Sequence, residues 1–179
     1  MNICQSHKLI AIAAMGENRE IGKNGGLCFK SDEDMEIFKS VTMGQVVIMG
    51  RKTLDSIRGG KGLKNRLNIV LTRDPKLLEE GTRMLGDGEP QIMFESTVEG
   101  VMEIVESMYG REDRKHSFIV GGAEIYDMFK DHINAALISN FDKTDEEANT
   151  FLPKIEHPLK LHESRVYNDF ILEYYVRWA

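Results

Sequence analysis

The acidic residue Asp34 occupies an unusual position for a charged side chain. Residues 31–41 have the apolar spacing of an amphipathic helix. At about 100° per residue, Asp34 falls at the centre of the apolar face, with Ile37, Phe38 and Val41 within about 60° of it. Burying a carboxylate among apolar side chains is costly unless it has a partner. A ligand rich in hydrogen-bond donors would be such a partner, and a lone acid in an apolar cleft is suited to handling protons.

The same carboxylate also has a purely structural explanation. The run Ser31-Asp32-Glu33-Asp34 matches a capping box, in which Asp34 would accept a hydrogen bond from the Ser31 amide. A carboxylate in the first helical turn also interacts favourably with the helix dipole. The sequence leaves both interpretations open.

A first strand end carries residues that suit a phosphate group. The strand expected over residues 45–49 stops at Gly50 and is followed by Arg51, Lys52 and Thr53. Free amides at a helix N-terminus, with two cations and a hydroxyl, can hold an anion. The spacing is not that of a Walker loop, because Arg51 stands where that motif needs a lysine.

A second strand end carries paired glycines. Gly121 and Gly122 follow the strand expected over residues 116–120, and they allow the backbone to approach a ligand closely. The turn lacks the G-x-G-x-x-G spacing of the dinucleotide-binding fingerprint. Either turn could be a simple connection. Two such turns in one domain, with Thr72 and Arg73 ending a third strand, favour a nucleotide site.

Short apolar strands alternate with helical segments along the chain. Alternation predicts parallel βαβ units, and a closing hairpin predicts an antiparallel edge. A length of 179 residues fits one domain over residues 1–179. We therefore expect an α/β domain with a mixed, mostly parallel eight-stranded sheet flanked by four helices. The expected strands are 8–15, 45–49, 66–72, 91–94, 116–120, 134–140 and two within 155–178 joined near 167–169; the expected helices are 31–41, 51–57, 97–109 and 123–129, and 59–65 and 81–90 are expected to be surface loops.

Composition excludes several classes of protein. A net charge of −6 argues against a general nucleic-acid binder, which would show a basic excess. The apolar run at residues 9–15 is too short for a bilayer, which needs about 20 residues. Cys4 and Cys28 cannot form a disulfide framework, so free thiols in a reducing compartment are expected. The histidines lack the spacing of a zinc motif, so no metal site is expected.

Taken in order, these pieces resemble the dihydrofolate reductase family over nearly the whole chain. The resemblance implies NADPH-dependent reduction of 7,8-dihydrofolate to 5,6,7,8-tetrahydrofolate, with hydride passing to pterin C6 and a proton to N5. It also implies a cytoplasmic monomer that binds small molecules, including antifolate inhibitors, and neither nucleic acid nor membrane. The matching segments are residues 9–14, Ile21-Gly22, Asp34 with Phe38-Lys39, residues 47–53 with Ser56-Ile57, residues 66–73, residues 120–126 and the terminal hairpin.

The resemblance assigns Asp34 as the pocket carboxylate that binds the pterin 2-amino group and N3. It would favour N5 protonation through water rather than by direct transfer. Arg66 would pair bidentately with the glutamate α-carboxylate of the substrate, and Ser139 would hydrogen-bond to the acid. The implied substrate-binding set is Ile12, Ala13, Met35, Phe38, Lys39, Ile57, Arg66, Val120 and Ser139.

The resemblance also implies a cofactor side. Arg51 and Arg73 favour NADPH over NADH, because a 2′-phosphate needs cations where NAD sites place an acid. The implied cofactor-binding set is Ala14, Ile21, Gly22 and Leu27 around the nicotinamide, with Gly50, Arg51, Lys52, Thr53, Leu71, Thr72, Arg73, Gly121, Gly122, Ala123, Glu124, Ile125 and Tyr126 along the rest of the molecule.

Three departures from the family pattern stand out. Cys28-Phe29 replaces the usual Pro-Trp, and Phe29 has no N–H donor. Asn24, followed by two glycines, predicts an unusually flexible covering loop and altered gating. Glu124 occupies a position that is basic in some relatives. The alternatives are a riboflavin-pathway pyrimidine reductase of the same fold, and a structural or generic nucleotide-binding protein without turnover.

Overall fold

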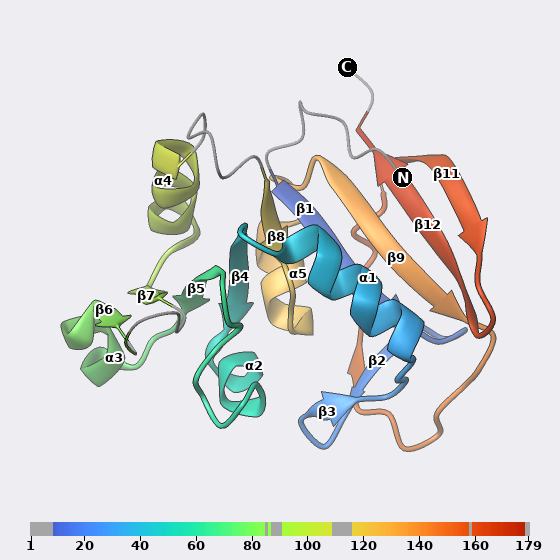
Figure 1. The fold of residues 1–179 in the computed structure, drawn as a ribbon, viewed down its shortest axis with the longest axis horizontal. Helices are drawn as coiled ribbons and strands as arrows, with labels where there is room; N and C mark the ends of the chain where they lie inside the picture. Colours follow the sequence, from blue (N-terminus) through green and yellow to red (C-terminus); the bar gives the residue numbers. More distant parts are fainter. Residues whose placement is uncertain (1–8, 85, 87–90, 109–115, 158, 178–179) are drawn as a thin grey trace.

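A nine-stranded sheet forms the centre of the molecule (Figure 1). The computed structural model describes residues 9–84, 86, 91–108, 116–157 and 159–177. The strands are β1 (Leu9–Met15), β4 (Val46–Gly50), β5 (Leu67–Leu71), β6 (Thr82–Met84), β7 (Gln91–Glu95), β8 (Ser117–Ile119), β9 (Ala135–Phe141), β11 (Lys160–Val166) and β12 (Phe170–Val176). Their order is β11-β12-β9-β1-β8-β4-β5-β7-β6. The six strands from β9 to β7 are parallel. At one edge β6 pairs antiparallel with β7, and at the other β12 pairs antiparallel with both β9 and β11.

A small second sheet lies beside the carboxyl ends of the parallel strands. It contains β2 (Glu20–Lys23), β3 (Gly26–Leu27) and β10 (Thr150–Phe151) in the order β10-β2-β3. Asn24 and Gly25 join β2 to β3 with φ of 51° and 80°, the left-handed pair that a type I′ hairpin turn requires. The segment expected to be a flexible loop therefore folds as a tight hairpin.

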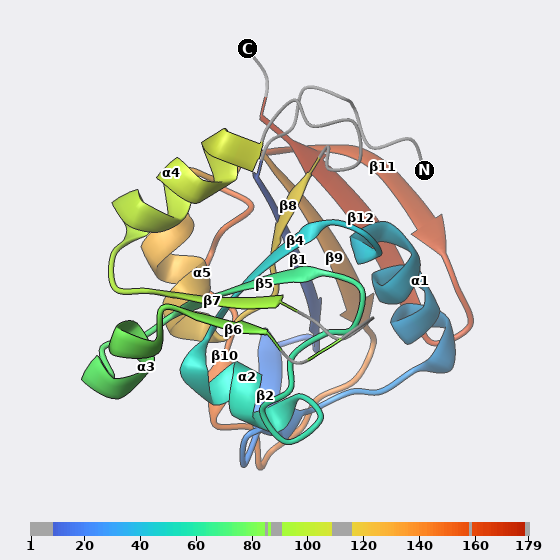
Figure 2. The same ribbon diagram turned by 60° about the vertical axis from the view of Figure 1, so that its left-hand side comes forward.

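Five helices of the described chain cover the two faces of the large sheet. They are α1 (Asp32–Thr42), α2 (Arg51–Ser56), α3 (Pro75–Glu80), α4 (Val98–Met108) and α5 (Ala123–Phe129). Apolar residues of α1, α2 and α3 pack on one face, and those of α4 and α5 pack on the other. Figure 2 shows α1 and the α4–α5 pair on opposite sides of the sheet. In the described residues, no helix is long and apolar enough to cross a membrane.

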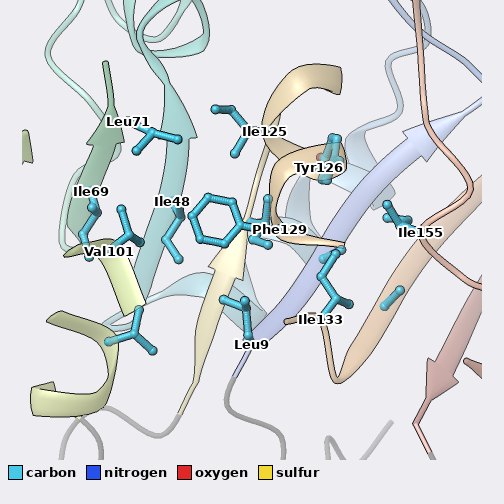
Figure 3. Close-up of a cluster of buried hydrophobic side chains, with 14 of the residues drawn as sticks. Leu9, Ile48, Ile69, Leu71, Val101, Ile125, Tyr126, Phe129, Ile133 and Ile155 are labelled. Carbon is cyan, nitrogen blue, oxygen red and sulfur yellow. The ribbon is translucent and has the colours of Figure 1, made fainter. Parts of the chain in front are cut away.

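The parallel strands are mainly apolar because both faces of the sheet are covered. Ile48 of β4 and Leu9 of β1 are fully buried on the α4–α5 face. Figure 3 shows Phe129 of α5 in the middle of that cluster, beside Ile48. On the α1 face, Phe118 of β8 is fully buried, and so is Val47 of β4.

The sequence predicted the architecture correctly but not all of its elements. The mostly parallel mixed sheet, the flanking helices and the C-terminal hairpin are confirmed. The expected numbers are wrong: the main sheet has nine strands rather than eight, and the described residues contain five helices rather than four. The additional helix α3 begins directly after Asp74, whose side chain caps the helix by accepting from the Lys76 amide at 3.0 Å. The additional strand β6 lies in the segment 81–90, which was expected to be a loop.

Phe118→Ala tests the central position of β8. Removing this fully buried ring should lower the free energy of unfolding by about 3–5 kcal/mol, because a cavity replaces well-packed atoms. Urea denaturation measures the change. Val166→Ala, at a position that is 82% exposed in edge strand β11, should change it by only about 0.5 kcal/mol. Equal, small losses in both variants would contradict the assigned core.

Candidate functional site

The short strand β8 opens the sheet at the carboxyl ends of its neighbours. It pairs with β1 only as far as Ala11↔Ile119 and with β4 only as far as Ile48↔Ile119. Beyond these pairs, residues 12–15 of β1 continue beside β9 alone. Strands β4, β5 and β7 lie on one side of this opening, and β1 and β9 lie on the other. Ligands of open α/β sheets bind at such a switch point.

Asp34 reaches this opening from helix α1. The Ser139 hydroxyl of β9 donates to Asp34 Oδ1 at 2.6 Å, and Ser139 is 3% exposed. The Ser31 hydroxyl caps the helix by accepting from the Asp34 amide at 3.5 Å. The Asp34 backbone therefore serves the cap while its carboxylate faces the sheet. The side chain is half-buried, as the helical periodicity predicted.

The surroundings of Asp34 favour its protonated form. Burial raises the pKa of the Asp34 carboxyl above its ordinary value, and the hydrogen bond from Ser139 offsets part of that rise. The acid consequently holds a proton more tightly than an exposed aspartate does. A ligand that donates hydrogen bonds to the carboxylate would restore its charged form.

Apolar residues from several elements surround this acid. The half-buried side chains Ile12, Ala14, Phe29, Ile57 and Val120 pack against the same core face as α1. Ala13 points to the opposite face and packs against the α4–α5 cluster, so only its backbone faces the opening. Phe38 is half-buried on α1.

The rim next to α1 is hollow. Met35 is 46% exposed and Leu27 is 50% exposed. Together with Lys30, Ser31, Asp32 and Asp169, they line a hollow of about 480 Å³. Large apolar side chains exposed around a hollow are available to contact a ligand.

A buried tyrosine connects the two sides of the opening. The Tyr126 hydroxyl donates to the Ile12 carbonyl at 2.6 Å, and Tyr126 is 3% exposed. Burial raises the pKa of Tyr126, so the phenol stays a donor. Tyr126, which was expected to bind the cofactor, therefore positions the carbonyl of Ile12, which was expected to bind the substrate.

Arg66 is a buried cation whose hydrogen bonds go to neutral groups. Its Nε and Nη2 donate to Thr42 Oγ1 at 3.1 and 3.0 Å. Its Nη1 and Nη2 also donate to the carbonyls of Lys64 and Lys39, at 2.7 and 3.2 Å. Burial lowers the pKa of Arg66, and no carboxylate of the described residues pairs with it. An anionic ligand would supply the missing countercharge.

The glycine turns come together on the other side of the opening. The Gly50 amide donates to the Gly121 carbonyl at 2.9 Å, and the Gly121–Gly122 peptide is cis. A side chain at Gly121 would lie 3.3 Å from the Tyr126 ring at a φ of +107°. Gly50 and Gly122 are the N-cap residues of α2 and α5 and provide no side-chain cap, which leaves the first amides of these helices available to an anion.

The expected phosphate-binding cations are exposed, and two of them have carboxylate partners. Arg51 pairs with Asp55 at 2.8 Å, and Arg73 lies 3.7 Å from Glu124. Such exposed pairs are weak enough for a bound phosphate to replace them. Of the other expected cofactor residues, Lys52 and Arg73 are exposed, and Thr53 and Ala123 are half-buried.

Four more of the expected cofactor residues are buried in the fold: Ile21, Leu71, Thr72 and Ile125. These four would contact a cofactor mainly through their backbone.

Comparison with known proteins decides the family. The model of the dihydrofolate reductase family matches residues 8–169. The chain is 33% identical over 149 residues to dihydrofolate reductase type A13 of Escherichia coli, covering 83% of this chain and 79% of that one. It is 31% identical over 158 residues to the dihydrofolate reductase of Heliothis virescens, covering 83% and 80%.

The chain belongs to the dihydrofolate reductase family. The fold agrees: the structure of the Enterococcus faecalis dihydrofolate reductase complexed with NADP(H) and RAB-propyl superposes with a TM-score of 0.76 at 24% identity, covering 95% of this chain and 96% of that one. The resemblance drawn from the sequence is confirmed. Neither a pyrimidine reductase nor a non-catalytic protein is favoured by these matches.

A buried glutamate, Glu20, anchors the covering segment, which contains the β2–β3 hairpin. The sequence did not reveal this role. Glu20 is 2% exposed and accepts from the amides of Asn18 at 2.8 Å and Asp145 at 3.3 Å. Burial alone would raise the pKa of Glu20, but hydrogen bonds from its own amide, from the Asp145 amide and from Asn18 lower it overall. A side chain at Gly16 would meet the Lys143 carbonyl at 2.5 Å, so the approach of the two segments requires glycine there. Local sequence gives no signal of contacts between such distant segments.

The tip of the covering segment is also tied to the segment before β10. Lys23 Nζ lies 3.1 Å from Asp145 and 2.8 Å from Glu147, and these hydrogen bonds raise the pKa of Lys23 to about 12. The Asn149 amide donates to the Gly22 carbonyl at 3.1 Å. These contacts hold the β2–β3 hairpin beside the site.

Phe29, in place of the family's tryptophan, belongs to a row of aromatic rings. It stacks on Phe141 at 5.5 Å between centroids with an interplanar angle of 16°. Phe141 contacts Phe170 at 5.2 Å, and Phe170 stacks on Tyr167 at 4.8 Å. The row links the start of α1 to the β11–β12 turn, so Phe29 is held by packing rather than by a hydrogen bond.

Ser139→Ala tests the control of the acid. Without this donor, the pKa of Asp34 should rise further, because the bond from Ser139 lowers it. The limb of the kcat/KM profile for dihydrofolate reduction that depends on Asp34 should therefore move to higher pH. Ser139→Thr keeps the hydroxyl and should follow the wild type, as should Ser40→Ala on exposed α1 surface. An unchanged profile in Ser139→Ala would show that the bond does not tune the acid.

Proposed function

We propose that this chain reduces 7,8-dihydrofolate to 5,6,7,8-tetrahydrofolate with NADPH at the opening between α1, β1 and β9. The observation that carries the proposal is the Asp34 carboxylate, half-buried among apolar side chains and held at 2.6 Å by Ser139. Membership of the family supports the same reaction.

Asp34 is well placed to bind the pterin edge. Oδ1 already accepts from Ser139, which leaves Oδ2 and the remaining lone pairs for the 2-amino group and N3 of the substrate. Because burial raises the pKa of Asp34, the site favours a proton on the bound pterin, and N5 would receive it through water. The half-buried Ile12, Phe38 and Val120 exclude bulk solvent around the ring.

The outer end of the substrate would lie between α1 and the α2–β5 loop. Met35, Phe38 and Ile57 would contact its aminobenzoyl ring. Arg66 would bind the α-carboxylate of its glutamate. Within the described residues, every hydrogen-bond partner of this buried guanidinium is neutral, so the carboxylate would supply its countercharge. Lys39 is exposed beside it.

The glycine turns fit the cofactor. When bound, NADPH supplies the hydride that reduces pterin C6. The open amides after Gly50 and Gly122 would bind its pyrophosphate. Arg51, Lys52 and Arg73 would bind its phosphates after Arg51 and Arg73 leave Asp55 and Glu124.

The organisation of the enzyme follows from the same site. We propose a single domain over residues 1–179 that works as a monomer. The free thiol of Cys28 supports a reducing compartment such as the cytoplasm. Antifolate inhibitors that present donors to Asp34 should compete with dihydrofolate.

Asp34→Asn tests the proposed function. The change keeps the shape of the side chain and removes its proton affinity, so kcat/KM should fall by about 10²–10⁴-fold at neutral pH. Loss of NADPH absorbance on adding dihydrofolate measures the rate. Glu36→Gln, on the exposed face of α1, is the matched control and should keep near-normal turnover.

Denaturation should separate a lost function from a lost fold. Because the pKa of Asp34 is raised in the folded state, ionisation at neutral pH costs stability, and Asp34→Asn should be at least as stable as the wild type. Wild-type turnover in Asp34→Asn would remove Asp34 from the mechanism. Failure of the wild type to oxidise NADPH would overturn the proposed function.

A further inference from the structure

A carboxylate lies beside one of the cations expected to bind a phosphate of the cofactor. Glu124 is in the first turn of α5, and its Oε1 is 3.7 Å from Nη2 of Arg73. The side chains of Glu124 and Arg73 are 77% and 87% exposed, so a ligand can reach both of them. Arg73 has a role in the proposed function, whereas Glu124 has none of its own.

The fold brings this pair to the far end of the row of strands that carries the glycine turns. Strands β8, β4 and β5 are neighbours in that order. Gly121 follows β8, Gly50 ends β4, and Arg73 comes two residues after the end of β5. Helix α5 starts close to Gly50, where an added side chain would lie 3.0 Å from Ile125. Glu124 thus reaches past the end of β4 to the segment after β5.

This position decides which part of a dinucleotide the pair would meet. The open amides after Gly50 and Gly122 are the groups assigned to the pyrophosphate. With the nicotinamide at the opening beside β1, the adenosine half would extend the other way, toward the end of β5. NADPH and NADH differ only at the adenosine 2′-oxygen, which carries a phosphate in NADPH and a hydrogen in NADH. Glu124 and Arg73 would lie where this difference is recognised.

The two side chains of the pair favour different cofactors. A guanidinium binds a phosphate through charge-assisted hydrogen bonds. A carboxylate accepts a hydrogen bond from a ribose 2′-hydroxyl, which is how dinucleotide sites select NAD. The same carboxylate repels a 2′-phosphate, because like charges placed together oppose binding. A phosphate must also displace Glu124 from Arg73, whereas a hydroxyl can use Glu124 where it stands.

We propose that Glu124 determines cofactor selectivity in this chain. It lowers the affinity for NADPH by opposing the 2′-phosphate, and it supports NADH by accepting from the 2′-hydroxyl, so the protein uses NADH as a second hydride donor. The reduction itself is unchanged: pterin C6 gains a hydride, N5 gains a proton, and NAD⁺ is released in place of NADP⁺. This inference rests on the proposed function.

A purely structural role for Glu124 makes a different prediction. A carboxylate in the first turn of a helix interacts favourably with the helix dipole. That interaction stabilises α5 equally whichever cofactor is bound. The ratio of the two affinities therefore separates the two roles.

Calorimetric titration with NADP⁺ and NAD⁺ tests the inference without turnover. The wild type should bind both. In Glu124→Gln the NADP⁺ affinity should rise and the NAD⁺ affinity should fall, so that their ratio increases about fivefold, as expected for one exposed charge interaction. High salt should reduce the gain in NADP⁺ affinity. Arg73→Gln should weaken NADP⁺ binding and leave NAD⁺ binding nearly unchanged.

A matched control lies on the same helix. Asp127 is exposed and pairs with Lys130 at 3.1 Å, so Asp127→Asn also removes one negative charge and one exposed ion pair from α5. It should keep the wild-type ratio. An unchanged ratio in Glu124→Gln, an equal increase in Asp127→Asn, or a wild type that does not bind NAD⁺ would overturn the inference.

Turnover distinguishes this inference from the proposed function. With dihydrofolate present, the wild type should oxidise NADH as well as NADPH, and Glu124→Gln should raise the ratio of kcat/KM for NADPH to that for NADH. Oxidation of NADPH alone would overturn the use of NADH and leave the proposed function intact. The predicted affinities without reduction of dihydrofolate would overturn the proposed function and leave Glu124 as the selectivity residue.

Discussion

The hydrogen bond from Ser139 to Asp34 is the contact on which the site depends. It joins helix α1 to strand β9 at 2.6 Å and turns a carboxylate toward the sheet, where burial opposes its charge. Within the part of the chain that the structure describes, Ser139 is the one donor to that carboxylate, which has room to accept more. Because charged groups are poorly stabilised in such surroundings, a donor-rich ring gains more from this acid than it would from an exposed one.

The sheet makes room for this contact by ending one strand early. Because β8 stops at Ile119, β1 and β4 have no strand between them at their carboxyl ends, and the Gly121–Gly122 turn lies there instead. The Tyr126 hydroxyl and the Gly50 amide secure the two sides of the opening. Substrate and cofactor would therefore meet across backbone that is already hydrogen-bonded, with little reorganisation on binding.

Local patterns predicted much of this arrangement. The period of 3.6 residues correctly placed Asp34 on the inward face of α1, and apolar runs correctly placed the parallel strands. The sequence did not reveal Glu20 or the stacking of Phe29 on Phe141, because each depends on a partner from a distant segment. Asn24 and the glycines after it were expected to form a flexible loop, but Asn24 and Gly25 form a tight turn. An Asn-Gly pair is also the strongest short hairpin signal. The residue roles that rest on bound ligands stay predictions.

A titration of Asp34 itself tests the central claim most directly. Aspartate carboxyl groups labelled with carbon-13 can be followed by NMR as a function of pH, and Asp34→Asn assigns the resonance. The structure predicts that Asp34 titrates at a higher pH than the ordinary aspartate value of about 3.9. A midpoint at or below that value would contradict a buried, singly hydrogen-bonded acid at the centre of the site.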